Sequence, residues 1–185
     1  MSTIAEDIVT EHQLVAEVLE AVGPDAPAGV GSWTAADLAA HLFSQVAAGG
    51  VAVFAGRSLI TRGVRLTAIA GSSTDRVIAH YRRKGFSRAV ESLRCGPPHL
   101  LLRDRVAPVS LFEVWMHHDD LRRANDLERP AEPASLDQAL EFALRYQRKV
   151  LGSERVDRTR PNGDLLRWLA GRPSLLPPHE PALRF

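Results

Sequence analysis

The sequence predicts an all-α protein. Apolar residues recur at helical spacing in several segments, and no stretch alternates with period two for long enough to form a strand. The connections between the helical segments are rich in glycine and proline, and their lengths favour a bundle with one or two long crossover connections. The chain has 185 residues without an internal repeat, so we expect a single domain over 1–185.

The first two helices have clear beginnings and ends in the sequence. Residues 3–22 carry apolar side chains on a helical period, and Gly23 is expected to end that helix. Thr34 is a predicted N-cap for the second helix. Asp37 stands at the third helical position, where a carboxylate meets free N–H groups and the positive end of the helix. We expect this helix to run to about Phe54.

The middle of the chain has weaker signals. Residues 55–73 hold several glycines and no clean period, which indicates a long connection that includes at most one short helix. Thr74 is expected to cap a third helix that ends near Leu93. Gly85 interrupts it, at a cost of about 1 kcal/mol relative to alanine. Residues 99–106 are predicted to be a connector.

The segment 108–124 is predicted to be the central helix. Pro108 suits a first helical turn because its missing N–H has no partner there, and Ser110 could cap the same end. Asn125 is expected to stop the helix.

The rest of the chain predicts two more helices. A proline-rich loop at 127–134 leads to a helix that Ser135 opens and that ends near Val150. A short helix follows within 161–172, with Gly171 as its stop. We expect residues 155–185 to form a C-terminal extension that packs on the bundle.

The central helix carries a polar stripe on one face. Residues three and four apart share a helix face, so Glu113, His117 and Asp120 lie together beside large apolar residues. A carboxylate and an imidazole one turn apart form half of a metal site. The alternative is a surface helix whose histidine is solvated, and one E-x-x-x-H match does not decide between them.

A third candidate ligand lies on the second helix. His41 falls on its apolar side, one turn beyond Asp37. Together His41, Glu113 and His117 make a His₂Glu set, the composition of catalytic zinc sites that keep one position open. Asp37 and Asp120 are natural acceptors for the ring N–H groups that face away from the metal.

The remaining histidines give no comparable pattern. His118 points about 100° away from His117 on an ideal helix, so we expect it to be structural. His12, His80, His99 and His179 lack a neighbour pattern.

Composition excludes several classes of protein. A net charge of +1 and a pI of about 8.0 argue against a nucleic-acid partner. Cys95 is the single cysteine, so neither an intrachain disulfide nor a cysteine-based zinc knuckle can form. There is no signal peptide and no apolar run of the roughly 18 residues that a membrane helix needs, so a cytoplasmic protein is expected. An H-E-x-x-H motif, a G-x-S-x-G elbow and a phosphate loop are all missing.

Three motifs in order along the chain resemble one family. Residues 31–42 contain W-T-x-x-D-x-x-x-H-L, residues 112–121 contain E-x-x-x-H-x-x-D-[IL], and residues 164–172 read D-L-x-x-W-L-x-G-R. The chain is similar in these segments to the mycothiol-dependent maleylpyruvate isomerase-like family of the DinB-like metalloprotein superfamily. The match of all three is specific, whereas any one alone is not.

The resemblance implies a DinB-like four-helix bundle with a divalent metal at its mouth. The metal is typically zinc, with nickel as the alternative, and the family motif places the ligands at His41, Glu113 and His117. Mycothiol or a similar low-molecular-weight thiol would be the cosubstrate, and its thiolate would attack a small electrophilic substrate. The resemblance to this superfamily also suggests that the protein forms a homodimer.

This chain departs from the isomerase in one respect. The isomerase adds a C-terminal α/β domain, for which too few residues follow the bundle here. Thiol transfer or detoxification is therefore favoured over maleylpyruvate isomerisation. Two alternatives stay open: a non-enzymatic metal-binding bundle with a stress-related or regulatory role, and a metal-free bundle in which His41 and Glu113 only form hydrogen bonds.

Overall fold

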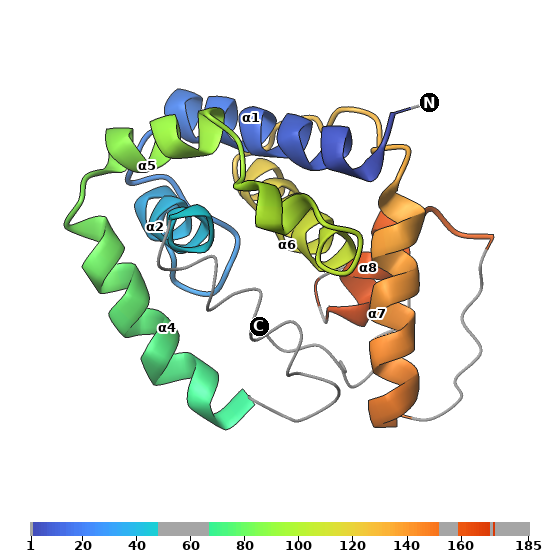
Figure 1. Ribbon diagram of the computed structural model, residues 1–185. Coiled ribbons are helices and arrows are strands. Elements are labelled where there is room, and N and C mark those ends of the chain that lie inside the picture. Colours follow the sequence, from blue (N-terminus) through green and yellow to red (C-terminus); the bar gives the residue numbers. More distant parts are fainter. Residues whose placement is uncertain (1, 48–66, 152–158, 171, 173–185) are drawn as a thin grey trace.

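The computed structural model describes residues 2–47, 67–151, 159–170 and 172, with the backbone alone for 67–73 and 146–151. Figure 1 shows the arrangement of the helices. The described part is all-α, as predicted, and its only extended pairing is an isolated bridge between Pro27 and Thr34. The helices are α1 (Ile4–Val22), α2 (Ala35–Val46), α4 (Thr67–Arg82), α5 (Phe86–Arg94), the 3₁₀ helix η1 (His99–Leu102), α6 (Ala107–Ala124), α7 (Leu136–Leu151) and α8 (Asn162–Leu169).

The first two helices begin where local chemistry predicts. The Thr34 side chain accepts a hydrogen bond from the backbone N–H of Asp37, and the Asp37 carboxylate accepts one from the backbone N–H of Thr34. Thr3 and Glu6 form the same reciprocal pair at the start of α1, and Gly23 ends that helix. Each pair satisfies N–H groups that a helix end leaves free. α2 ends at Val46, and residues 48–54 of the predicted helix lie outside the described residues.

The prediction of one helix from Thr74 to Leu93 is wrong. There are two helices, and the first begins at Thr67, within the predicted connection, rather than at Thr74. Gly85 separates them with a φ of +96°, a conformation that costs glycine little and other residues much. The glycine is thus a break between helices rather than a weak point inside one.

The boundaries of α6 are close to the prediction, but its cap differs. Pro108 lies in the first turn and Asn125 ends the helix, as expected. Ser110 does not cap the N-terminus; its hydroxyl donates to the carbonyl oxygen of Val106 within the helix. The predicted connector 99–106 contains the short η1 helix, and α7 and α8 fall within their predicted segments. Gly171, the predicted stop of the last helix, lies outside the described residues.

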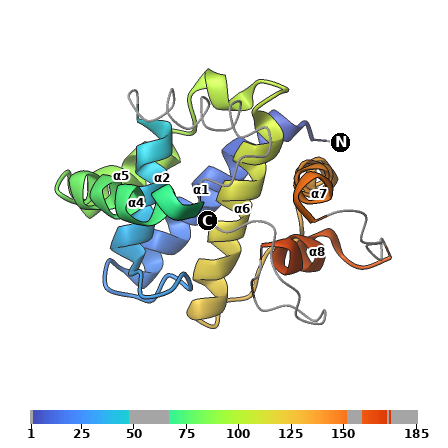
Figure 2. The same cartoon turned by 90° about the horizontal axis from the view of Figure 1, so that it is seen from below.

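α6 lies between two groups of helices. Figure 2 shows α2, α4 and α5 on one side of it and α7 and α8 on the other, while α1 crosses α6 and contributes to both sides. Each side has its own hydrophobic core, to which α6 contributes Val114 and Leu121 on one side and Phe112 and Trp115 on the other. Every residue from 109 to 121 is buried. The polar side chains of α6 therefore need partners inside the protein.

Two glycines allow other segments to approach α6 closely. Gly29 has a φ of +75°, and a Cβ atom there would lie 2.4 Å from the backbone oxygen of Asp120. A Cβ on Gly163 of α8 would lie 2.4 Å from Oε1 of Glu132 and 2.8 Å from the indole of Trp115. All three distances are shorter than van der Waals contact, so a side chain at either glycine would push its segment away from α6. None of the described helices is long and apolar enough to cross a membrane.

A buried histidine on α1 predicts how stability depends on pH. Burial lowers the pKa of His12 to about 4, although Nδ1 lies 2.8 Å from the Ile8 carbonyl oxygen. The unfolded chain takes up this proton below about pH 6.5 and the folded chain only near pH 4, so stability is lost as the pH falls through that window. We expect His12→Gln to reduce the loss of unfolding free energy between pH 7 and pH 5 by about 2 kcal/mol.

Urea unfolding at the two pH values measures this difference. The exposed His80 on α4 provides the control, because His80→Gln removes a histidine without changing the surroundings of His12. An identical pH dependence in wild type and His12→Gln would contradict the prediction.

Candidate metal centre

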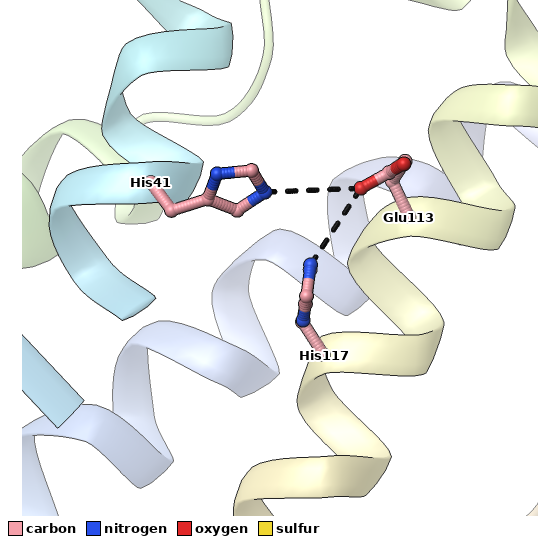
Figure 3. A group of neighbouring side chains, drawn as sticks. All are labelled: His41, Glu113 and His117. Carbon is pink, nitrogen blue, oxygen red and sulfur yellow. Dashed lines mark ion pairs between the residues drawn. The ribbon is translucent and has the colours of Figure 1, made fainter. Parts of the chain in front are cut away.

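The structure brings the three predicted ligands together. His41 extends from α2 towards α6, where Glu113 and His117 lie one turn apart (Figure 3). The Oε2 atom of Glu113 lies 3.9 Å from Nε2 of His41 and 3.6 Å from Nε2 of His117. One ligand atom from each of the three residues lies within 4.8 Å of the others. The polar stripe on α6 thus faces the helix that carries the third ligand.

The carboxylate of this cluster is buried and charged. Burial raises the pKa of Glu113, but its interactions with the neighbouring imidazoles, the one with His117 above all, outweigh that effect and hold the pKa well below its usual range. Glu113 and His117 are buried, whereas His41 keeps 19% of its side chain exposed. The cluster is therefore a largely enclosed site that contains one carboxylate and reaches the surface beside His41.

Two further side chains border the cluster, and the sequence reasoning missed both. The carboxamide nitrogen of Gln45 lies 3.0 Å from Nε2 of His41 and 3.4 Å from Oε2 of Glu113. The Trp33 ring lies 5.2 Å from the His41 ring and stacks on the His117 ring at 6.3 Å, measured between centroids. The signals were present: Gln45 follows His41 by one helical turn, and Trp33 directly precedes the N-cap.

The two aspartates predicted to support the histidines take different places. Oδ2 of Asp120 lies 3.9 Å from Nδ1 of His117, beyond hydrogen-bond distance. Nδ1 of His117 is buried without a hydrogen-bond partner among the described residues. The Asp37 carboxylate binds the N-cap Thr34 and the guanidinium of Arg82, which lies 2.7 Å from Oδ1. The supporting role of the two aspartates remains a prediction.

His118 lies outside the cluster, in keeping with the expectation that it is structural. Its Nδ1 lies 2.7 Å from Oε2 of Glu11 on α1, and its Nε2 accepts a hydrogen bond from Nε of Arg122. Because Nε2 accepts, Nδ1 carries the proton and the ring is neutral. Burial lowers the pKa of His118, which agrees with a neutral ring. His118 thereby connects α6 to α1.

A network of ion pairs holds the C-terminal end of the described chain against α6. Arg167 on α8 contacts the carboxylates of Asp119 and Asp120, and the Arg172 Nε lies 3.0 Å from Oδ2 of Asp120. Arg129, which precedes α7, lies 3.4 Å from Asp119 and 3.3 Å from Glu11. The arginines compensate carboxylates that would otherwise be buried without a counter-charge.

The donor set fits a divalent transition metal. Two imidazole nitrogens and a carboxylate oxygen are ligands that zinc accepts, and imidazole also suits nickel, copper and iron. Two ligands of a tetrahedral zinc ion lie about 3.4 Å apart, close to the distances from Glu113 to both histidines. The carboxylate of Asp120 lies on the Nδ1 side of His117, where a metal-binding histidine usually has an acceptor, but at 3.9 Å it does not form that hydrogen bond here. The cluster can therefore hold a metal ion.

Comparisons of this chain with family models, curated proteins and solved structures found no match.

Proposed function

We propose that this protein is a metal-dependent enzyme that transfers a low-molecular-weight thiol of the mycothiol type to small electrophiles. The observation that carries the proposal is the convergence of His41, Glu113 and His117 from two helices. Three protein ligands are the number that catalytic zinc sites use, since they leave one position for a reactant. The three sequence motifs support the choice of a thiol as that reactant.

The helix arrangement supports a DinB-like four-helix bundle. α1 packs along α6, and α2 packs against α4 and α5. The proposed ligands come from α2 and α6, as the resemblance implies. In this proposal α7 and α8 are the C-terminal addition that covers the far side of α6.

The chain's own residues suggest how the reaction would be organised. A zinc ion, or nickel as the alternative, would act as a Lewis acid that lowers the pKa of a thiol at the open position. Glu113 and the two histidines would hold the ion. Trp33 would restrict the motion of both imidazole rings.

The thiol has to come from a cosubstrate. Cys95 is the only cysteine of the chain, and it is exposed at the end of α5, outside the candidate cluster. In the proposed reaction the thiol proton passes to solvent, the sulfur forms a bond to an electrophilic carbon, and the leaving group departs with its bonding electrons. Isomerisation of a cis double bond would instead begin with addition of the thiolate to that bond and end with loss of the same thiolate.

Metal analysis and a thiol assay test this proposal. Protein purified without chelator should contain close to one zinc or nickel ion per chain and should accelerate the reaction of mycothiol with monochlorobimane. His41→Ala should lose both properties, whereas His80→Ala should keep both because that side chain is exposed on α4. Metal without thiol-dependent turnover would favour the non-enzymatic alternative. Failure to bind any metal after reconstitution would overturn the proposal.

A further inference from the structure

Gln45 interacts with two of the three candidate ligands. It is buried on α2, and its carboxamide nitrogen lies within hydrogen-bond distance of both Nε2 of His41 and Oε2 of Glu113. The polarity of these contacts follows from the chemistry of the partners. A carboxylate oxygen accepts hydrogen bonds, and the NH₂ end of the amide faces Oε2 of Glu113 at 3.4 Å.

The same nitrogen determines the tautomer of His41. An amide NH₂ group donates and does not accept, so Nε2 of His41 must offer its lone pair. Gln45 therefore donates to one lone pair on each of two atoms that would bind a metal ion. A cation between these atoms needs electron pairs on both of them.

We propose that the Gln45 amide holds the centre together in the absence of metal and that a metal ion has to displace it from Nε2 of His41, whose single lone pair it occupies. In the metal-free protein the amide orients both ligands and partly compensates the buried carboxylate. Binding of the ion exchanges the hydrogen bond to His41 for a coordination bond. Gln45 thus stabilises the metal-free centre and weakens its affinity for the metal. The inference rests on the proposed metal site.

Removal of the amide should tighten metal binding. A hydrogen bond to a charged group contributes enough that its loss from the metal-free state should lower the dissociation constant of the metal by about tenfold. Gln45→Leu removes the N–H donors and introduces an apolar side chain of similar size. Gln45→Ala removes them with a different side-chain volume, so the two variants share only the loss of the amide.

Competition with a chromophoric chelator, with Zn²⁺ and Ni²⁺ each as the probe, measures the dissociation constants. Thermal unfolding of the metal-free proteins provides the second measurement. We expect both variants to bind metal more tightly than wild type and to melt at a lower temperature without metal. Gln138→Leu on the exposed face of α7 is the matched control and should change neither quantity.

The outcomes distinguish this inference from the proposed function. Unchanged or weaker metal binding in Gln45→Leu and Gln45→Ala would overturn the inference, and weaker binding would mean that the amide helps to hold the ion. The proposed metal site would survive both results. Absence of metal binding in wild type and variants alike would overturn the metal site and the inference with it.

Discussion

Replacement of Arg167 by methionine is expected to lower the free energy of unfolding by about 3–5 kcal/mol. Arg167 is 3% exposed, and its guanidinium contacts the carboxylates of Asp119 and Asp120, which are equally buried. Methionine fills much of the same volume but leaves both carboxylates with less counter-charge. The cost arises because Arg123, Arg129 and Arg172 remain near the two carboxylates but do not replace the buried guanidinium, and hydration cannot make up the lost attraction.

Arg123 offers a matched control on one of the same carboxylates. Its Nε lies 2.9 Å from Oδ2 of Asp119, but 57% of its side chain is exposed. An exposed ion pair contributes roughly 0–1 kcal/mol, so Arg123→Met should have a small effect. Denaturant unfolding of both variants at neutral pH measures the difference. Similar small losses of unfolding free energy in Arg167→Met and Arg123→Met would show that α8 is not held to α6 through Arg167.

Replacement of Glu113 by glutamine is expected to abolish stabilisation by metal. At a free metal concentration of 100 times the dissociation constant, binding stabilises a folded protein by about 2.7 kcal/mol. The substitution keeps the shape of the side chain and removes the only anionic ligand of the proposed site. Without that charge, two imidazoles and an amide remain, and affinity should fall so far that the melting temperature no longer responds to Zn²⁺ or Ni²⁺.

Thermal unfolding with and without metal measures this response. Glu17→Ala, on the exposed face of α1, controls for general loss of an acidic residue and should keep the full response. The metal-free proteins supply a second readout. Because the pKa of Glu113 is lowered on folding, wild type should lose stability as the pH falls below about 4.5, and Glu113→Gln should lose less. A full metal response in Glu113→Gln would contradict the proposed ligand set.

The sequence by itself was sufficient for features whose causes are local. A helical period and a cap depend on residues within one or two turns, which is why α1, the capping pair of Thr34 and Asp37, and the limits of α6 could be predicted. The same locality places Glu113 and His117 on one face of α6. The prediction failed at Gly85, where a glycine was interpreted as a tolerated interior residue and its positive φ instead separates two helices.

Only the tertiary structure could decide which helices meet. His41 approaches Glu113 because one hydrophobic core, to which α2 and α6 both contribute, places the two helices side by side, and motif pairing could suggest this contact but not its geometry. The contacts of Gln45 with Glu113 and of Arg167 with Asp120 join residues far apart in the sequence, which no local pattern identifies. A buried polar residue takes whichever partner the packing brings to it, because leaving it unpaired costs more than any local preference.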